Sequence, residues 1–133
     1  MADEHGDEHS MDKGDVDEVE DRLRAVCLGL PEVVEGTNHH GEPSWRIRRR
    51  TLAQISERHP AGRRSFWVPA PAGAKEAMVA AEPDRFFSPP YGGRDWVGVY
   101  LDGPVDWAEV RELVVDAYRL IAPRKLVDGL GEA

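Results

Sequence analysis

Cysteine, long hydrophobic runs and a secretory leader are scarce or missing in this sequence, and each absence excludes a class of protein. The single cysteine, Cys27, cannot form an internal disulfide or a cysteine-based zinc site. No window approaches the roughly 20 consecutive apolar residues that a helix needs to cross a bilayer. The first residues, MADEHGDEHSMDKGD, have neither the basic start nor the apolar stretch of a secretory signal. We therefore expect a soluble, cytoplasmic protein with no membrane contact.

Sequence signatures of catalysis are missing as well. The chain has no Gly-x-Ser-x-Gly elbow, no phosphate-binding glycine loop followed by Lys-Ser or Lys-Thr, and no paired His-Glu motif on a helix. Cys27 lies on or beside the apolar face of an expected helix, which favours a buried core thiol over a nucleophile. We expect a protein that is not an enzyme and holds no cofactor, although active sites are built in space rather than in sequence.

Histidine occurs in three places that are candidates for metal binding. Asp3-Glu4-His5 and Asp7-Glu8-His9 lie in an acidic tail, and His39-His40 lies in an expected loop. An unstructured acidic tail rarely makes a specific metal site, because binding would have to offset the cost of ordering the chain. The His39-His40 pair has no nearby cysteine and no spaced third ligand. We predict no metal site.

The net charge of -8 is concentrated at one end of the chain. Residues 1–20 hold nine acidic residues and one lysine, whereas residues 21–133 hold sixteen acidic and sixteen basic residues. Within the neutral part, residues 43–75 carry eight basic residues against the single acid Glu57. The chain therefore has a local basic segment that suits an anionic ligand such as DNA. The acidic tail could fold back on that segment and weaken binding. Removal of residues 1–14 would then tighten DNA binding at low salt.

Hydrophobic periodicity predicts one α+β domain. Residues 1–14 have too few large apolar side chains to fold, and we expect a disordered tail. Apolar residues then recur at helical spacing up to Pro31, and Asp106 with Glu109 forms a capping box before the last helix, which Pro123 ends. The predicted order is α-β-β-β-α-β-α, with helices on one side of a mainly antiparallel sheet. The domain is expected to span residues 15–127, followed by a short tail over 128–133.

The middle of the chain predicts a three-stranded meander. Trp45 and Ile47 alternate with arginines, and Phe66 and Val68 alternate with Trp67. Leu52 and Ile55 are three residues apart and cannot face the same side of a regular strand, so the register of the second strand stays unassigned. The expected elements are strands at 45–48, 51–56 and 64–68, a helix at 73–81, a structured loop at 84–95, a strand at 96–101 and a helix at 106–123.

The run RFFSPPYGGRDWVGVYLD from Arg85 to Asp102, followed by VDWAEVRELVVDAYRLIAPRKL from Val105 to Leu126, is the most characteristic part of the sequence. With these motifs in register, residues 21–127 resemble the MmcQ/YjbR family of small bacterial proteins with a frataxin-like, or CyaY-like, fold. The resemblance implies DNA binding through β-hairpins in a double-wing arrangement. The chain departs from the family pattern in two places, since Arg48-Arg49-Arg50-Thr51 replaces a glycine-containing turn and the acidic tail is an addition.

The arginine-rich hairpin is the first candidate site. Arginine can pair with phosphates or guanine edges, and a β-ribbon is narrow enough to enter a major groove. The alternative is a solvated strand face whose arginines pair with nearby acids and protect an edge from aggregation. The DNA-binding hypothesis predicts that one open surface carries Arg46, Arg48, Arg49, Arg50, Arg63 and Arg64, with Trp67 available for stacking.

The loop over residues 85–96 is the second candidate site. Aromatic walls with a few polar groups are typical of small-ligand pockets. The predicted pocket would contain Phe86, Tyr91, Arg94 and Trp96, in a small-ligand or protein-interaction module. The alternative is a packed hydrophobic cluster under a long loop, because aromatic residues dominate core energetics. The sequence gives no oligomeric state, and we take a monomer as the starting expectation.

Overall fold

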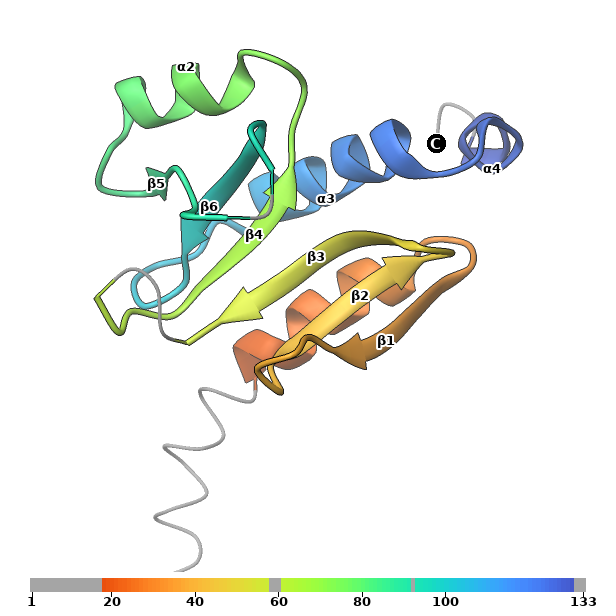
Figure 1. Ribbon diagram of the computed structural model, residues 1–133, viewed down its shortest axis with the longest axis horizontal. Helices are drawn as coiled ribbons and strands as arrows, with labels where there is room; N and C mark the ends of the chain where they lie inside the picture. The colour runs from red at the N-terminus through yellow and green to blue at the C-terminus, as the bar shows by residue number, and fades with distance from the viewer. Residues whose placement is uncertain (1–17, 58–60, 92, 131–133) are drawn as a thin grey trace, which may run out of the picture.

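A six-stranded sheet forms the centre of the structure, a computed structural model that describes residues 18–57, 61–91 and 93–130 (Figure 1). The strand order is β1-β2-β3-β4-β6-β5, and every neighbouring pair is antiparallel. The α+β class and the antiparallel sheet are as predicted. The strands are β1 (Val33–Thr37), β2 (Pro43–Ile47), β3 (Arg50–Ser56), β4 (Ser65–Pro69), β5 (Phe86–Phe87) and β6 (Trp96–Tyr100).

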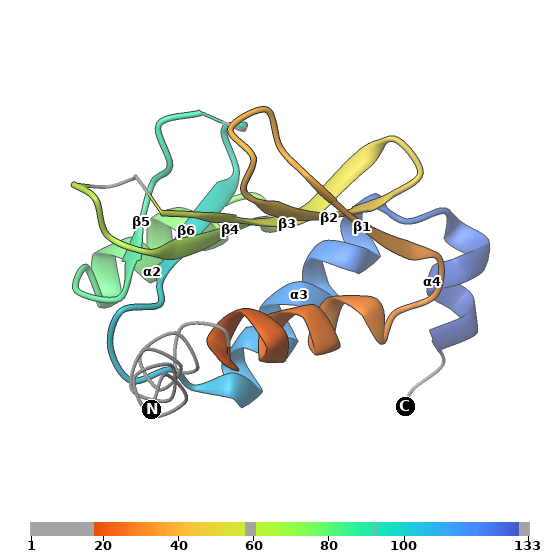
Figure 2. The same cartoon turned by 90° about the horizontal axis from the view of Figure 1, so that it is seen from below.

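Two helices cover one face of this sheet. Residues 18–28 form the N-terminal helix, which lies beside α3 (Trp107–Ile121) under the sheet (Figure 2). Asp106 caps α3 and accepts a hydrogen bond from the Glu109 amide at 3.2 Å, as the capping box predicts. Helix α3 buries Val110, Val114, Ala117, Tyr118 and Ile121 against the sheet. Helix α2 (Ala74–Ala81) packs beside β5.

Three short elements were not predicted. Strand β1 is an edge strand with only Val33 buried, so it lacks the alternation that identifies a half-buried strand. Strand β5 has two residues. Helix α4 (Arg124–Leu130) begins directly after Pro123, which ends α3 and accepts hydrogen bonds from the Leu126 and Val127 amides in the new first turn. Residues 128–130, expected in a tail, are therefore helical, and the observed order is α-β-β-β-β-α-β-β-α-α.

A β-bulge explains the register of β3 that the sequence left open. Trp45 pairs with Ala53, but the next residue, Arg46, pairs with Thr51, so Leu52 is the extra residue of β3. The bulge changes the alternation along the strand. Leu52 and Ile55 are consequently both fully buried in the core although they are three residues apart.

The two faces of the sheet differ in what covers them. The helix-covered face carries the core side chains of β2, β4 and β6, among them Trp45 and Phe66. The opposite face, called the outer face below, carries the alternate residues, which include Ser44, Arg46 and Trp67. Along the three described stretches, no helix has the length and apolar character that a membrane span requires.

Candidate functional site

The β2–β3 hairpin presents three exposed arginines. Arg46 lies on the outer face of β2, Arg49 lies in the two-residue turn, and Arg50 begins β3, where it pairs with the core residue Ile47 and so starts on the helix-covered side. In the part of the chain that the structure describes, none of these three guanidinium groups has a carboxylate within ion-pair distance. We call Arg46, Arg49 and Arg50 the turn arginines. Their charges are available to a ligand without the loss of an internal ion pair.

The fourth arginine of this hairpin, Arg48, has a different environment. Its guanidinium donates two hydrogen bonds to Glu32 Oε1, at 3.1 and 2.9 Å. Arg48 has φ of 57° and Glu32 has φ of 65°, so both residues take the left-handed backbone region that non-glycine residues rarely adopt. The ion pair thus joins two strained positions, and a glycine at position 48 would relieve one of them.

Arg63 and Arg64 lie at the other end of β3, close to the start of β4. The seven residues of β3 separate the two ends by about 23 Å. Arg63 donates to both carboxylate oxygens of Asp102, at 2.7 and 2.9 Å, and its guanidinium lies 3.6 Å from the centre of the Tyr100 ring. Arg64, whose side chain is 11% exposed, is ion-paired with Glu20 and Glu57 at 3.4 and 3.2 Å. The prediction of one arginine surface from Arg46 to Arg64 is therefore wrong.

Electrostatics strengthens the pairing at this end. The pKa of the Asp102 carboxyl lies below its ordinary value, mainly because Arg63 donates hydrogen bonds to the ionised form. The pKa of Arg63 is raised, first by its hydrogen bonds to the same carboxylate. A phosphate could bind Arg63 only in competition with a bidentate carboxylate.

Trp67 is not available for stacking, contrary to the prediction. Its side chain is fully buried, and its indole Nε1 donates to Ser65 Oγ at 3.0 Å. Phe87 and Tyr91 contact the ring edge-on, with centroid distances of 6.4 and 4.9 Å. Alternation placed Trp67 on the outer face correctly, but the segment after β5 folds over that part of the face.

The four residues of the predicted aromatic pocket do not gather in one place. Phe86 is buried in the core, where it pairs with Val99 of β6. Tyr91 packs on Trp67, whereas Arg94 is exposed and Trp96 contributes to a shallow cleft with Arg50. The packed-cluster alternative describes this loop better than a single ligand pocket does.

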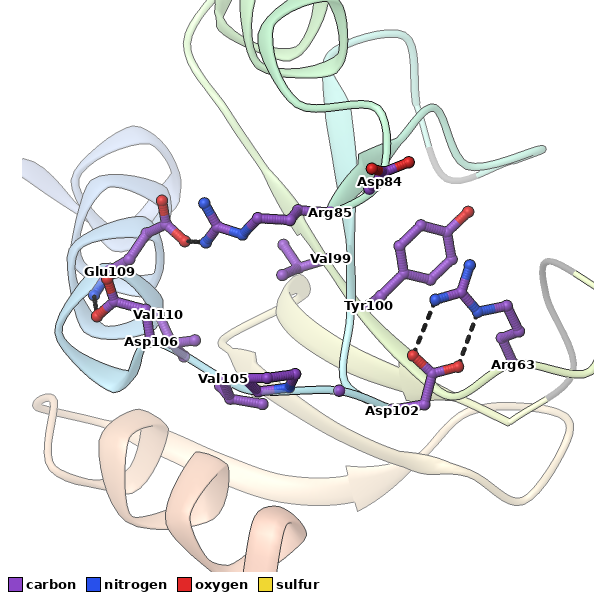
Figure 3. A pocket seen from close by; sticks show the side chains of 12 residues that line it. Arg63, Asp84, Arg85, Val99, Tyr100, Asp102, Val105, Asp106, Glu109 and Val110 are labelled. Carbon is purple, nitrogen blue, oxygen red and sulfur yellow. Dashed lines mark hydrogen bonds and ion pairs between the residues drawn. The ribbon is translucent and has the colours of Figure 1, made fainter.

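A small charged cleft lies between the end of β6 and the start of α3 (Figure 3). Its volume is about 110 Å³, and its floor includes Val99, Val105 and Val110. Arg85 reaches across to Glu109 and also pairs with Glu82 at 2.8 Å, while Arg63 and Asp102 close the other side. Sequence reasoning missed this cleft because Arg63 and Asp102 are 39 positions apart. Both of its arginines are paired with carboxylates. The side chains of this cleft therefore hold neighbouring elements together and do not form an open binding site.

Cys27 and the histidines complete the residues singled out from the sequence. Cys27 is fully buried in the core, as the sequence predicted, and burial raises the pKa of its thiol. No group of three His, Cys, Asp or Glu side chains suited to a metal ion occurs among the residues described. The acidic tail motifs at 3–5 and 7–9 and the basic residue Arg58 lie outside the described ranges.

Comparison with known proteins agrees with this architecture. A family model described as YjbR matches residues 28–120. The chain belongs to the YjbR family. The YjbR fold is also seen in the crystal structure of the Deinococcus radiodurans protein DR2400, a DUF419 domain, which superposes with a TM-score of 0.66 at 22% identity over 79% of each chain. None of the curated proteins matches the sequence. The predicted family is thus confirmed, and the likeness to DR2400 supports the fold.

Proposed function

We propose that this YjbR protein is a non-enzymatic DNA-binding protein whose turn arginines contact the phosphate backbone. The observation that carries the proposal is the contrast among six arginines of one basic segment. Three are exposed with no carboxylate partner inside the described ranges, and three are held in ion pairs. The proposal agrees with the DNA binding that the family resemblance implies.

Desolvation and competition favour the turn arginines as the contact group. An arginine already paired with a carboxylate must lose that partner before it binds a phosphate, so its net gain is small. Arg46, Arg49 and Arg50 have no carboxylate partner to exchange among the residues that the structure describes. Arg49 lies in the turn that joins β2 and β3, and Arg46 and Arg50 lie beside that turn in strands of the six-stranded sheet, so the turn is the part of this hairpin that DNA could approach.

The negative net charge of the chain does not oppose this proposal. Acidic residues account for the charge of -8 because nine of them lie in residues 1–20, whereas residues 21–133 are neutral. Binding depends on the local field at the contact surface, and the hairpin presents three positive charges there that no described carboxylate pairs with. A DNA complex should accordingly weaken as salt rises, because phosphate contacts release counterions.

A salt titration of DNA affinity tests the proposal. A labelled oligonucleotide, as a single strand and as a duplex, is bound to the wild type and to the variant Arg46→Gln/Arg49→Gln/Arg50→Gln. The slope of log K against log salt should fall by about one for each phosphate-contacting arginine removed. An unchanged slope and affinity would reject the turn arginines as the contact group.

A matched control removes the same number of charges from the other side of the molecule. Arg22, Arg111 and Arg119 are exposed on the N-terminal helix and α3, which cover the opposite face of the sheet. The variant Arg22→Gln/Arg111→Gln/Arg119→Gln has the same net charge as the hairpin variant. It should bind DNA nearly as well as the wild type, and equal losses in both variants would indicate a diffuse charge effect instead of a site.

A further inference from the structure

Three connections rise from the sheet on the side away from the helices. Figure 2 shows the β1–β2 connection and the segment between β5 and β6 rising at one end, and the β2–β3 turn rising at the other. The outer face of β2 lies between them, and Arg46 projects from it. One end of this face therefore carries the charged β2–β3 turn, and the other end carries the β1–β2 connection and the segment between β5 and β6.

The second end carries aromatic rings in contact with one another. His39 and His40 in the β1–β2 connection are exposed, and their ring centroids are 4.0 Å apart. Tyr91 approaches His40 with a centroid distance of 6.5 Å and packs on the buried Trp67 below it. Tyr91 is nevertheless 41% exposed as a residue. An exposed ring fixed on a buried one is a preformed surface for a planar ligand.

Hydrogen bonds hold the histidine-bearing connection in place. Asn38 Oδ1 accepts from the amides of His40 and Glu42, at 2.9 and 3.0 Å. The backbone amide of Asn38 donates to the backbone carbonyl of Glu42 at 2.9 Å, and this hydrogen bond closes the connection. Glu42 then accepts from the Glu57 amide at 3.0 Å through its carboxylate and so joins the connection to the end of β3. Rings on a pre-organised segment lose little conformational entropy when a ligand binds.

Arg46 lies within reach of these rings along the same face. The register places Ser44, Gln54 and Trp67 in one row across β2, β3 and β4, and Arg46 lies two residues further along β2. Two strand spacings and two residues correspond to about 12 Å between Arg46 and Trp67. That distance equals roughly three to four nucleotides of a stacked strand. A strand whose phosphates contact the turn arginines could thus place bases on the rings.

We infer that this face takes single-stranded nucleic acid, with bases stacked on Tyr91 and His40 and phosphates held by Arg46 and Arg49. This inference rests on the proposed function and specifies single-stranded nucleic acid as the class of ligand. Base faces are accessible to aromatic rings in a single strand but are covered by neighbouring bases in a duplex. The exposed rings therefore add affinity for a single strand only, whereas the arginines contribute to both.

Competition between single-stranded and duplex DNA tests the inference. Anisotropy with a labelled thymine oligonucleotide of about 15 nucleotides, near the footprint of a small single-strand-binding fold, is compared with a duplex of the same length. The wild type should prefer the single strand. Tyr91→Ala should lose about tenfold in single-strand affinity, the effect of one stacking contact, and keep its duplex affinity. Tyr91→Phe should stay within about twofold of the wild type because stacking needs the ring and not the hydroxyl.

The variants separate the failure of the inference from the failure of the proposed function. If Arg46→Gln/Arg49→Gln/Arg50→Gln loses affinity for both ligands while Tyr91→Ala binds the single strand like the wild type, backbone binding stands and base stacking is rejected. If the wild type prefers the duplex, the inference is rejected as well. If the wild type binds neither ligand at low salt, both proposals are rejected. Thermal melting of Tyr91→Ala confirms that it is folded, and His40→Ala provides a second variant for the same comparison.

Discussion

Arginines at the two ends of β3 have different roles. Within the described parts of the chain, the turn arginines at one end lack carboxylate partners, whereas Arg63 and Arg64 at the other end are paired with Asp102, Glu20 and Glu57. A basic run therefore has no single function. Each arginine is available or occupied according to which carboxylates the fold brings next to it.

This comparison separates two measurable quantities. Substitutions at the paired end should lower stability and leave DNA affinity nearly unchanged, because those arginines hold structural elements together. Substitutions at the turn should lower DNA affinity and leave stability nearly unchanged, because those arginines are exposed and have no ion pair with any described residue. Trp67, which lies between the two ends, is fully buried and should matter mainly for stability.

The largest expected effect is on stability, in Trp67→Ala. Its ring is fully buried between Phe87 and Tyr91, so its removal leaves a large cavity and should lower the free energy of unfolding by about 3–5 kcal/mol. Urea denaturation measures the change. Trp107→Ala is the matched control, because Trp107 is only partly buried and should cost clearly less. Equal losses in the two variants would contradict the structural role assigned to Trp67.

The next effect distinguishes the two ends directly. Arg64→Gln removes ion pairs to Glu20 and Glu57 from a side chain that is mostly buried, and should lower the free energy of unfolding by about 1–2 kcal/mol. Arg50→Gln, an exposed substitution with no pair to break among the described residues, should stay within about 0.5 kcal/mol of the wild type. Denaturation curves of both variants provide the comparison. A greater loss in Arg50→Gln would reverse the assignment of the two ends.

Backbone strain at the turn predicts a smaller effect. Arg48→Gly relieves the left-handed backbone at φ of 57°, and Arg48→Ala keeps that strain, while both variants lose the exposed pair with Glu32. The glycine variant should therefore be more stable than the alanine variant by about 1 kcal/mol. The difference between their unfolding free energies measures the strain without the ion pair. Equal stabilities would mean that Arg48 adopts its conformation without cost.

The smallest effect is a pH dependence at the paired end. Because the pKa of Asp102 is lower in the folded protein than in the unfolded chain, its contribution is fully present above the unfolded value, about 3.9 for an aspartate. It is lost as the pH falls through the lower folded pKa. The stability difference between the wild type and Asp102→Asn should consequently be largest near neutral pH and shrink below about pH 4. A difference that grows on acidification would contradict the Arg63–Asp102 pairing.

The sequence predicted elements whose signals are local. Helix α3 was found because Asp106 and Glu109 cap it and its buried residues recur at helical spacing. The alternation in β2 correctly placed Trp45 and Ile47 in the core and Arg46 outside. These features depend on neighbours along the chain, and the physical rules that govern them operate over a few residues.

Long-range contacts decided the rest. The bulge at Leu52 follows from pairing with β2, and no signal within β3 itself reveals it. Trp67 has the same alternation as a solvent-exposed residue, and only the placement of Phe87 and Tyr91 buries it. Asp102 lies 39 positions from Arg63, so their pairing required the fold. The sequence placed six arginines of the basic segment in the candidate site, and three of them, the turn arginines, remain in it.

The central claim is that DNA contacts the turn arginines and not the paired end, and backbone amide shifts test it most directly. A short DNA oligonucleotide is titrated into isotope-labelled protein at low salt while amide resonances are followed by NMR. The account predicts that amides of residues 46–51 shift, while those of residues 62–65 and of α3 stay in place. Shifts confined to residues 62–65 or to α3 would contradict it.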